Sequence, residues 1–310
     1  MLKKVAVIGA PLGYGAGKPG SELGVEAIRL AGLHGGRLID TIRKLGYEAE
    51  DRGNVDIVRP AGPALESANP KYLQETLTSC SNLADAVATG LADGCFPVIL
   101  GGDHSIAIGS VSGVAKYFRN RDESFGLIWF DAHADINTPA SSPTGNIHGM
   151  PLATLLGYGE PGLVDLCGFS PKLDPRYFAH VGARDLDDGE KGRIRELGLE
   201  GHFFTMSDID KRGMLDCVNE AIDIASQSSG GYAVTFDVDV IDPRFAPGSG
   251  TLVRGGATYR EAHLALEVIA ERGGMRSFEI VEVNPMLDQS NITVELACEL
   301  ILSALGKTIL

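Results

Sequence analysis

The residues with the most evident chemistry follow two apolar runs of the chain. Asp131-Ala-His133-Ala-Asp135 comes after one run, and Asp237-Val-Asp239 comes after the other. Because side chains alternate between the two faces of a strand, we expect Asp131, His133 and Asp135 to point the same way at a strand end. Two carboxylates and an imidazole on one face are suited to a divalent cation. A second acidic strand end therefore predicts a dinuclear site.

A third motif, Gly101-Gly-Asp-His104, adds another imidazole just past an apolar run. The candidate ligands are then His104, Asp131, His133, Asp135, Asp237 and Asp239. Their four carboxylates carry a charge that two divalent cations would balance. Carboxylate-rich ligation without thiolates suits two Mn²⁺ ions better than structural zinc, and such a pair can activate a shared water. A cluster of helix caps and salt bridges is the alternative, which three motifs on three strand ends argue against.

Two further residues lie near these motifs. His148 stands in the glycine-bounded loop Gly145–Gly149. A histidine beside such a site can carry protons at neutral pH, whereas an isolated loop histidine is more often a surface residue. Asp103 precedes Ser105 and a helical pattern, so it fits both a helix cap and a partner that orients His104. The sequence leaves both interpretations open.

A glycine-rich segment, Gly15-Ala-Gly-Lys-Pro-Gly20, matches the dinucleotide-binding fingerprint, and Asp51 fits the acid that binds the ribose. Its glycines, however, begin well after the preceding strand and beyond Pro11, where the fingerprint requires a tight turn. A loop beside the pocket is the better interpretation.

Apolar strand patterns alternate with helical patterns along the whole chain. We expect strands near residues 4–9, 46–51, 96–101, 126–132, 178–183, 202–206, 232–239 and 276–283. We expect helices near residues 22–33, 71–92, 105–118, 207–226, 258–272 and 291–305. Such alternation is typical of a parallel sheet covered on both faces. The sequence therefore predicts an α/β fold of three layers (α/β/α) with a mostly parallel sheet of about eight strands, formed by one domain over residues 1–310.

Composition excludes several classes of protein. The chain has 310 residues, with 27 basic and 41 acidic side chains and a net charge of −14. Nucleic acids and anionic membranes need clustered Lys and Arg, so we expect neither as a partner. The five cysteines are scattered, which favours reduced thiols in the cytoplasm. No apolar stretch is long enough for a membrane span.

Taken together, the motifs resemble those of the ureohydrolases, and among them the arginases. The resemblance rests on Gly101–Ser105, Asp131–Asp135 and Asp237–Asp239, and it extends nearly end to end, from Gly9 to Glu282-Val-Asn-Pro285. It implies two Mn²⁺ ions per chain and hydrolysis of L-arginine to L-ornithine and urea, in which a hydroxide that bridges the ions attacks the guanidinium carbon. It also implies a homotrimer or homohexamer.

The resemblance implies a role for each ligand and for three catalytic residues. Asp131 and Asp237 would bridge the ions, and the other candidate ligands would complete the two coordination spheres: His104 with Asp135, and His133 with Asp239. Asp135 would orient the hydroxide, His148 would carry a proton to the leaving amine, and Glu282 would pair with the guanidinium, whose planar shape matches a carboxylate.

The resemblance further implies a set of residues that bind the amino-acid end of the substrate. Asn137 and the segment Ser142–Asn146 correspond to the residues that bind the α-carboxylate in arginases, and the acidic residues of 185–190 correspond to those that bind the α-ammonium. The expected substrate-binding residues are Asn137, Ser142, Thr144, Asn146, Asp185, Asp187, Glu190, Thr258 and Glu282.

Three other functions would fit part of this set of motifs. An agmatinase or another guanidino hydrolase would share the metal motifs but would not need both recognition segments. A deacetylase-like metalloamidase would not need the second metal shell or Glu282. A non-enzymatic homologue should have lost ligands, and every candidate ligand is present.

Overall fold

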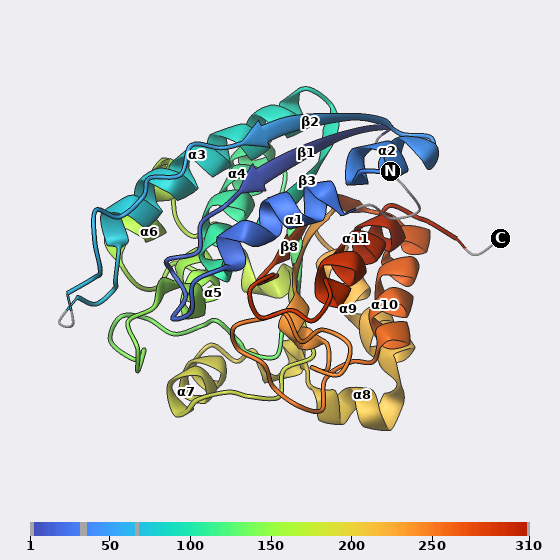
Figure 1. The fold of residues 1–310 in the computed structure, drawn as a ribbon. Coiled ribbons are helices and arrows are strands. Elements are labelled where there is room, and N and C mark those ends of the chain that lie inside the picture. Colours follow the sequence, from blue (N-terminus) through green and yellow to red (C-terminus); the bar gives the residue numbers. More distant parts are fainter. Residues whose placement is uncertain (1–2, 32–35, 66–67, 309–310) are drawn as a thin grey trace.

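Eight parallel strands form one sheet through the middle of the fold (Figure 1). The computed structural model describes residues 3–31, 36–65 and 68–308, and within them the strand order is β2-β1-β3-β8-β7-β4-β5-β6. All neighbouring strands pair in parallel. The strands are β1 (Lys4–Ala10), β2 (Glu48–Asn54), β3 (Cys95–Gly101), β4 (Gly126–Phe130), β5 (Phe178–Val181), β6 (Phe203–Phe204), β7 (Tyr232–Asp237) and β8 (Met275–Val281).

Helices cover both faces of the sheet and pack in separate clusters of buried residues. On one face lie α1 (Gly24–Leu30), α2 (Leu38–Lys44), α8 (Met206–Arg212), α9 (Met214–Ala225), α10 (Tyr259–Arg272) and α11 (Ile292–Ala304). In the second cluster or beside it lie α3 (Leu73–Ala92), α4 (Ala107–Arg119), α5 (Pro151–Leu155), α6 (Pro161–Val164) and α7 (Asp188–Glu196). Among the described residues, no helix combines the length and apolar content needed to cross a membrane.

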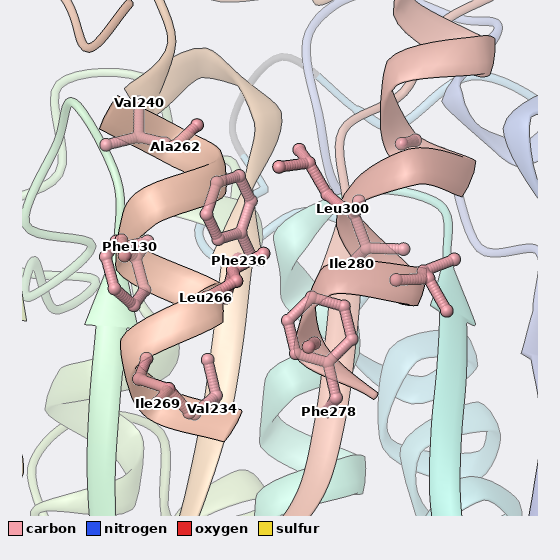
Figure 2. Packing of buried hydrophobic residues seen from close by; sticks show 14 of the residues in the cluster. Phe130, Val234, Phe236, Val240, Ala262, Leu266, Ile269, Phe278, Ile280 and Leu300 are labelled. Carbon is pink, nitrogen blue, oxygen red and sulfur yellow. The ribbon is translucent and has the colours of Figure 1, made fainter. Parts of the chain in front are cut away.

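Alternation along each strand sends neighbouring side chains into different clusters. In β4, Phe130 packs with α9–α11 while Trp129 packs with α3 and α4. Phe130 and Phe236 stack across adjacent strands with ring centroids 5.2 Å apart. Figure 2 shows both rings beside Leu266 of α10. Strands that are buried on both faces in this way form a rigid base for the loops that follow them.

The predicted fold class is confirmed, and the differences concern element boundaries. The helix expected near residues 207–226 is two helices, because Gly213 between them has φ of 86°. The helix expected near residues 22–33 is α1, and residues 32 and 33 lie outside the described residues. The expectations omit α2, α5, α6 and α7, which are too short to show a clear helical period.

The strand order brings together four strand ends that are far apart in the sequence. β3, β8, β7 and β4 are consecutive neighbours, and each is followed by residues of one motif. In parallel sheets of this kind, ligands bind beyond the carboxyl ends of the strands. The topology therefore gathers the motif residues at one edge of the sheet.

Leu266 offers a test of the helix–sheet packing. Its side chain has 0% exposure within the first cluster, so Leu266→Ala is expected to lower the free energy of unfolding by about 2–5 kcal/mol. Glu271→Ala, on the exposed surface of the same helix, is the control and should change stability by less than ~0.5 kcal/mol. Urea denaturation measures both, and a loss of less than ~1 kcal/mol for Leu266→Ala would contradict the packing.

Candidate metal centre

Loops, and not strands, present most of the motif residues. β4 ends at Phe130, so Asp131, His133 and Asp135 all follow it, and Asp239 lies in the short 3₁₀ helix Val238–Val240 after β7. The expectation that strand alternation aligns the first three is therefore wrong. Asp135 has φ of 53°, a left-handed conformation that redirects the chain at this point. The course of the loop brings these side chains together.

The side chains form two adjacent groups that share Asp131. In the first, called the His104 group (His104, Asp131, Asp135), His104 Nδ1 lies 3.1 Å from Asp131 Oδ2 and 3.1 Å from Asp135 Oδ2. Asp237 Oδ2 approaches the same nitrogen at 3.3 Å. In the second, the His133 group (Asp131, His133, Asp239), His133 Nδ1 lies 3.3 Å from Asp131 Oδ1 and 3.1 Å from Asp239 Oδ2. Asp131 thus directs Oδ2 towards His104 and Oδ1 towards His133.

The donor atoms of the His104 group fit a cation. His104 Nδ1 is buried and has no hydrogen-bond partner, although three carboxylates face it. The other ring nitrogen, Nε2, lies 2.9 Å from Thr235 Oγ1, whose hydroxyl donates to Glu279 at 2.7 Å. Thr235 Oγ1 therefore accepts from Nε2–H, and Nδ1 is the ring nitrogen left to bind an ion.

The titration behaviour of the cluster shows how strongly anionic its surroundings are. Burial, with repulsion from Asp239 and Asp131, raises the pKa of Asp237 well above its ordinary value. Burial, with Asp131, also raises the pKa of Asp135 to about 6. Burial lowers the pKa of His104, but the surrounding carboxylates outweigh it and raise that pKa well above its usual value. Carboxylates that hold protons this firmly also attract cations.

A cavity of about 200 Å³ opens beside the cluster. Its lining combines carboxylate, amide, hydroxyl and imidazole groups, and consists of His133, Asp135, Asn137, Ser142, Pro143, Thr144, Asn146, His148, Gly149, Asp187, Glu190, Asp237 and Thr251. A larger hollow of about 670 Å³, lined among others by Arg119, Phe169 and Lys172, contains none of the predicted site residues. The predicted site residues therefore lie at the smaller cavity.

Most of the predicted substrate-binding residues line this cavity. Asn137 donates from Nδ2 to Asp187 Oδ2 at 2.7 Å. Asp187 caps α7 through a reciprocal pair of hydrogen bonds with Glu190. Burial, with repulsion from Asp135, raises the pKa of Glu190 to about 7. The residues of the predicted set on this wall are Asn137, Ser142, Thr144, Asn146, Asp187 and Glu190.

Three predicted substrate residues are absent from the cavity lining: Asp185, Thr258 and Glu282. Asp185 is exposed and does not line the cavity. The Thr258 hydroxyl caps α10 by accepting from Glu261 N, and it donates to the Glu261 carboxylate. It does not line the cavity either. The expected roles of Asp185 and Thr258 in binding the substrate disagree with the positions of these side chains.

Thr251, which the sequence reasoning missed, lines the cavity and donates to Asp239 Oδ2 at 2.9 Å. It lies in an irregular loop without a motif, so no sequence signal marks it.

Glu282 and His148 meet at the side of the cluster. Glu282 follows β8 with φ of 63° and is 2% exposed. Its Oε1 accepts from the backbone N–H of His104 at 3.0 Å and lies 3.1 Å from His148 Nδ1. Burial lowers the pKa of His148, but the Glu282 carboxylate outweighs it and raises that pKa to about 9. His148 lines the cavity, and a pKa of about 9 keeps its imidazole protonated at neutral pH.

Asp103 serves as both a cap and an anchor. Its carboxylate accepts from Ser105 N at 3.0 Å, which caps the 3₁₀ helix His104–Ile106. It also accepts from Gly15 N at 2.7 Å and Ala16 N at 3.1 Å. A Cβ at Gly15 would lie 2.0 Å from Ser105 Oγ, so a larger residue there would force Ser105 to move. The amides that a nucleotide phosphate would need are occupied by Asp103, which excludes the dinucleotide interpretation.

The loop that carries Thr251 is closed at its base by Asp242. Its Oδ1 accepts from the Arg244 side chain at 2.7 Å, and its Oδ2 accepts from Gly255 N at 2.7 Å. An isolated bridge between Ile241 and Ala257 lies beside these bonds. Asp242 therefore holds the two ends of the loop together.

Comparison with known proteins places the chain in a family. A profile described as "Arginase family" matches residues 3–306. Proteins named arginase from Brevibacillus brevis and Bacillus subtilis (strain 168) are each 43% identical over 310 residues, with 100% of both chains covered. The native structure of arginase from Bacillus caldovelox superposes with a TM-score of 0.92 at 41% identity, covering 99% of this chain and 100% of that one. The chain belongs to the arginase family.

Asp242 makes the stability of the Thr251 loop depend on pH. Burial raises its pKa, but hydrogen bonds from Arg244 and Gly255 outweigh burial and lower that pKa from 3.8 to about 2. The stabilisation is therefore fully present above pH 3.8 and is lost as the pH falls through about 2. Asp242→Asn should lower the free energy of unfolding by about 1–3 kcal/mol at neutral pH, with the difference narrowing below pH 3.8. Urea denaturation at a series of pH values checks this, and a pH-independent difference would refute it.

Proposed function

We propose that this chain converts L-arginine and water to L-ornithine and urea. One observation carries the proposal: two carboxylate–imidazole groups that share Asp131 lie beside a small cavity lined by amide, hydroxyl and acidic side chains. The first feature suits a pair of cations, and the second suits the polar end of an amino acid. The full-length relatives named arginase support the same activity.

The two groups would hold two divalent cations. The His104 group with Asp237 would bind one, and the His133 group would bind the other, with Asp131 and Asp237 shared between them. We propose Mn²⁺, because carboxylate and imidazole donors without thiolates suit it. When bound, such a pair lowers the pKa of a water between the ions and so supplies a nucleophile at neutral pH.

The cavity would fix the amino-acid end of the substrate. Asn137, Ser142, Thr144 and Asn146 offer amide and hydroxyl donors for the α-carboxylate. On the adjoining wall, Asp187 and Glu190 offer carboxylates for the α-ammonium. Agmatine lacks the α-carboxylate and would leave the donors of the first wall without a partner, which favours L-arginine over that rival.

The residues at the cluster would act on the guanidinium. The Glu282 carboxylate would pair with the planar guanidinium and hold its carbon towards the nucleophile, and Asp135 would orient the attacking oxygen. His148, whose pKa of about 9 leaves it protonated at neutral pH, would give a proton to the leaving amine. The chain thus supplies orientation and a proton, and the cations supply the nucleophile.

Wider properties follow as proposals from membership of the family. We infer that the chain acts as a single domain on a small molecule, in the cytoplasm, as a homotrimer or homohexamer. The acidic charge of −14 supports the expectation that neither nucleic acid nor an anionic membrane is a partner.

Urea release tests the function directly. Apo protein reloaded with Mn²⁺ is incubated with L-arginine and with agmatine in parallel. We expect urea from L-arginine only, and none without added metal. Urea from agmatine alone would overturn the substrate, and urea from neither would overturn the function.

The recognition of the α-ammonium can be tested with two nearby aspartates. Asp187→Ala removes a carboxylate from the cavity wall and should raise KM for L-arginine at least about tenfold, since a charged hydrogen bond contributes about 1.5–3 kcal/mol. Asp185→Ala removes an exposed carboxylate outside the cavity and should leave KM within about twofold. Steady-state kinetics compare them, and equal effects would show that Asp187 has no special role.

His148→Asn tests the proton donor. We expect kcat to fall by a factor of about 10²–10⁴, because a general acid is lost. The number of Mn²⁺ ions per chain should not change, since His148 belongs to neither group. A variant with full kcat would exclude His148 from proton transfer.

A further inference from the structure

Arg184 lies beside the cluster without a carboxylate of its own. It follows β5, is largely buried, and takes part in no ion pair among the described residues. Its guanidinium donates instead to main-chain carbonyls: Nη2 to Asp239 O at 2.5 Å and to Val253 O at 2.8 Å, and Nη1 to Val240 O at 3.1 Å. Burial lowers its pKa, although the carboxylate of Asp239 opposes this. A buried charge bonded only to carbonyls calls for a physical explanation.

These bonds join the two segments that supply the His133 group. The backbone N–H of Arg184 donates to Ala132 O at 2.9 Å, between Asp131 and His133. The side chain of the same residue holds the carbonyl of Asp239. In addition, Ala132 N donates to Asp239 Oδ1 at 3.1 Å. One residue therefore fixes the spacing between the loop after β4 and the 3₁₀ helix after β7.

The contact with Val253 extends this connection to the loop of Thr251, whose hydroxyl donates to Asp239 Oδ2. The packing leaves little freedom here. A Cβ at Gly256 would lie 2.6 Å from Arg184 Nη2 and 2.5 Å from Val240 O. The planar guanidinium of Arg184 donates to four carbonyls at once, since Nη1 also reaches Gly182 O at 3.4 Å. The single ammonium of a lysine would bind carbonyls with a less fixed geometry.

The charge of Arg184 opposes cation binding, so its contribution must come from its hydrogen bonds. A positive group beside a cation site repels the incoming ion, and the carboxylates nearest Arg184 include Asp239 and Asp131. Holding these two residues at the correct spacing acts in the other direction, because ligands that are already in place lose less freedom when the ion binds. Within the described part of the chain, Arg184 makes no hydrogen bond to His104, Asp131 or Asp135, and its nearest link to the His104 group is the bond to Ala132 O, next to Asp131.

We propose that Arg184 is a positioning residue that sets the affinity of the His133 group for its cation and leaves the His104 group unaffected. The inference rests on the proposed function, because it assumes that both groups bind cations. Arg184 belongs to neither group of candidate ligands and does not line the substrate cavity.

The test is a titration of apo protein with Mn²⁺, followed by calorimetry and by the electron paramagnetic resonance signal of a coupled ion pair. In Arg184→Gln, one of the two sites should weaken about 10–100-fold while the other stays within about twofold, so the coupled signal should appear only at higher Mn²⁺. Arg184→Lys keeps the charge and loses the fork, so its affinity should fall between that of Arg184→Gln and the unaltered chain.

Arg276→Gln is the matched control. Arg276 also donates to a backbone carbonyl, Gly230 O at 2.7 Å. It lies at the start of β8, however, at the end of the sheet opposite to the metal centre. It should leave both affinities unchanged. The proposal is overturned if Arg184→Gln lowers the Mn²⁺ affinity of both sites equally or raises the affinity for the second ion. It is also overturned if neither affinity changes, as is expected for Arg276→Gln. If the unaltered chain binds no pair of ions, the proposed function fails first.

Discussion

The structure depends on confining several carboxylates at the ends of four adjacent strands. Such a cluster repels itself, and donors from the chain hold three of its carboxylates, those of Asp131, Asp237 and Asp239. Asp131 accepts from Trp129 Nε1 and His133 N, and Asp239 accepts from Ala132 N and the Thr251 hydroxyl. These hydrogen bonds orient the carboxylates so that Asp131 Oδ2 faces His104 and Asp239 Oδ2 faces His133. A pair of cations would remove the remaining repulsion, so the same residues that strain the fold prepare the site.

The sheet supplies the rigidity that this arrangement needs. Its strands are buried on both faces, and the order β3-β8-β7-β4 sets the spacing of the four loops. Left-handed backbone at Asp135 and Glu282 turns these side chains towards the cluster. The cavity is built differently, from loops that carry polar side chains, and Asp242 holds together the ends of the loop that carries Thr251. The proposed metal ligands and the proposed substrate-binding residues thus lie at the same end of the sheet.

The sequence predicted the features that depend on short segments, and it missed those that depend on contacts between them. Strand positions are local patterns, and the observed fold agrees with them. The three motifs are local patterns too, and their side chains meet in two groups that could hold metal ions. Strand alternation was the wrong reason for the meeting of Asp131 and Asp135, because a loop turn decides it. Thr251 and Arg184 act through tertiary hydrogen bonds and carry no motif. Thr258 has a hydroxyl, as a substrate-binding residue would need, but that hydroxyl bonds to Glu261 in the cap of α10.

The central claim, that the two groups hold a pair of cations, is tested most directly by a crystal structure of the Mn²⁺-loaded protein with anomalous scattering recorded at the manganese edge. The account predicts two anomalous peaks per chain, one bound by His104 Nδ1 and Asp135 and the other by His133 Nδ1 and Asp239, with Asp131 between them. A single peak, or peaks away from these side chains, would contradict it.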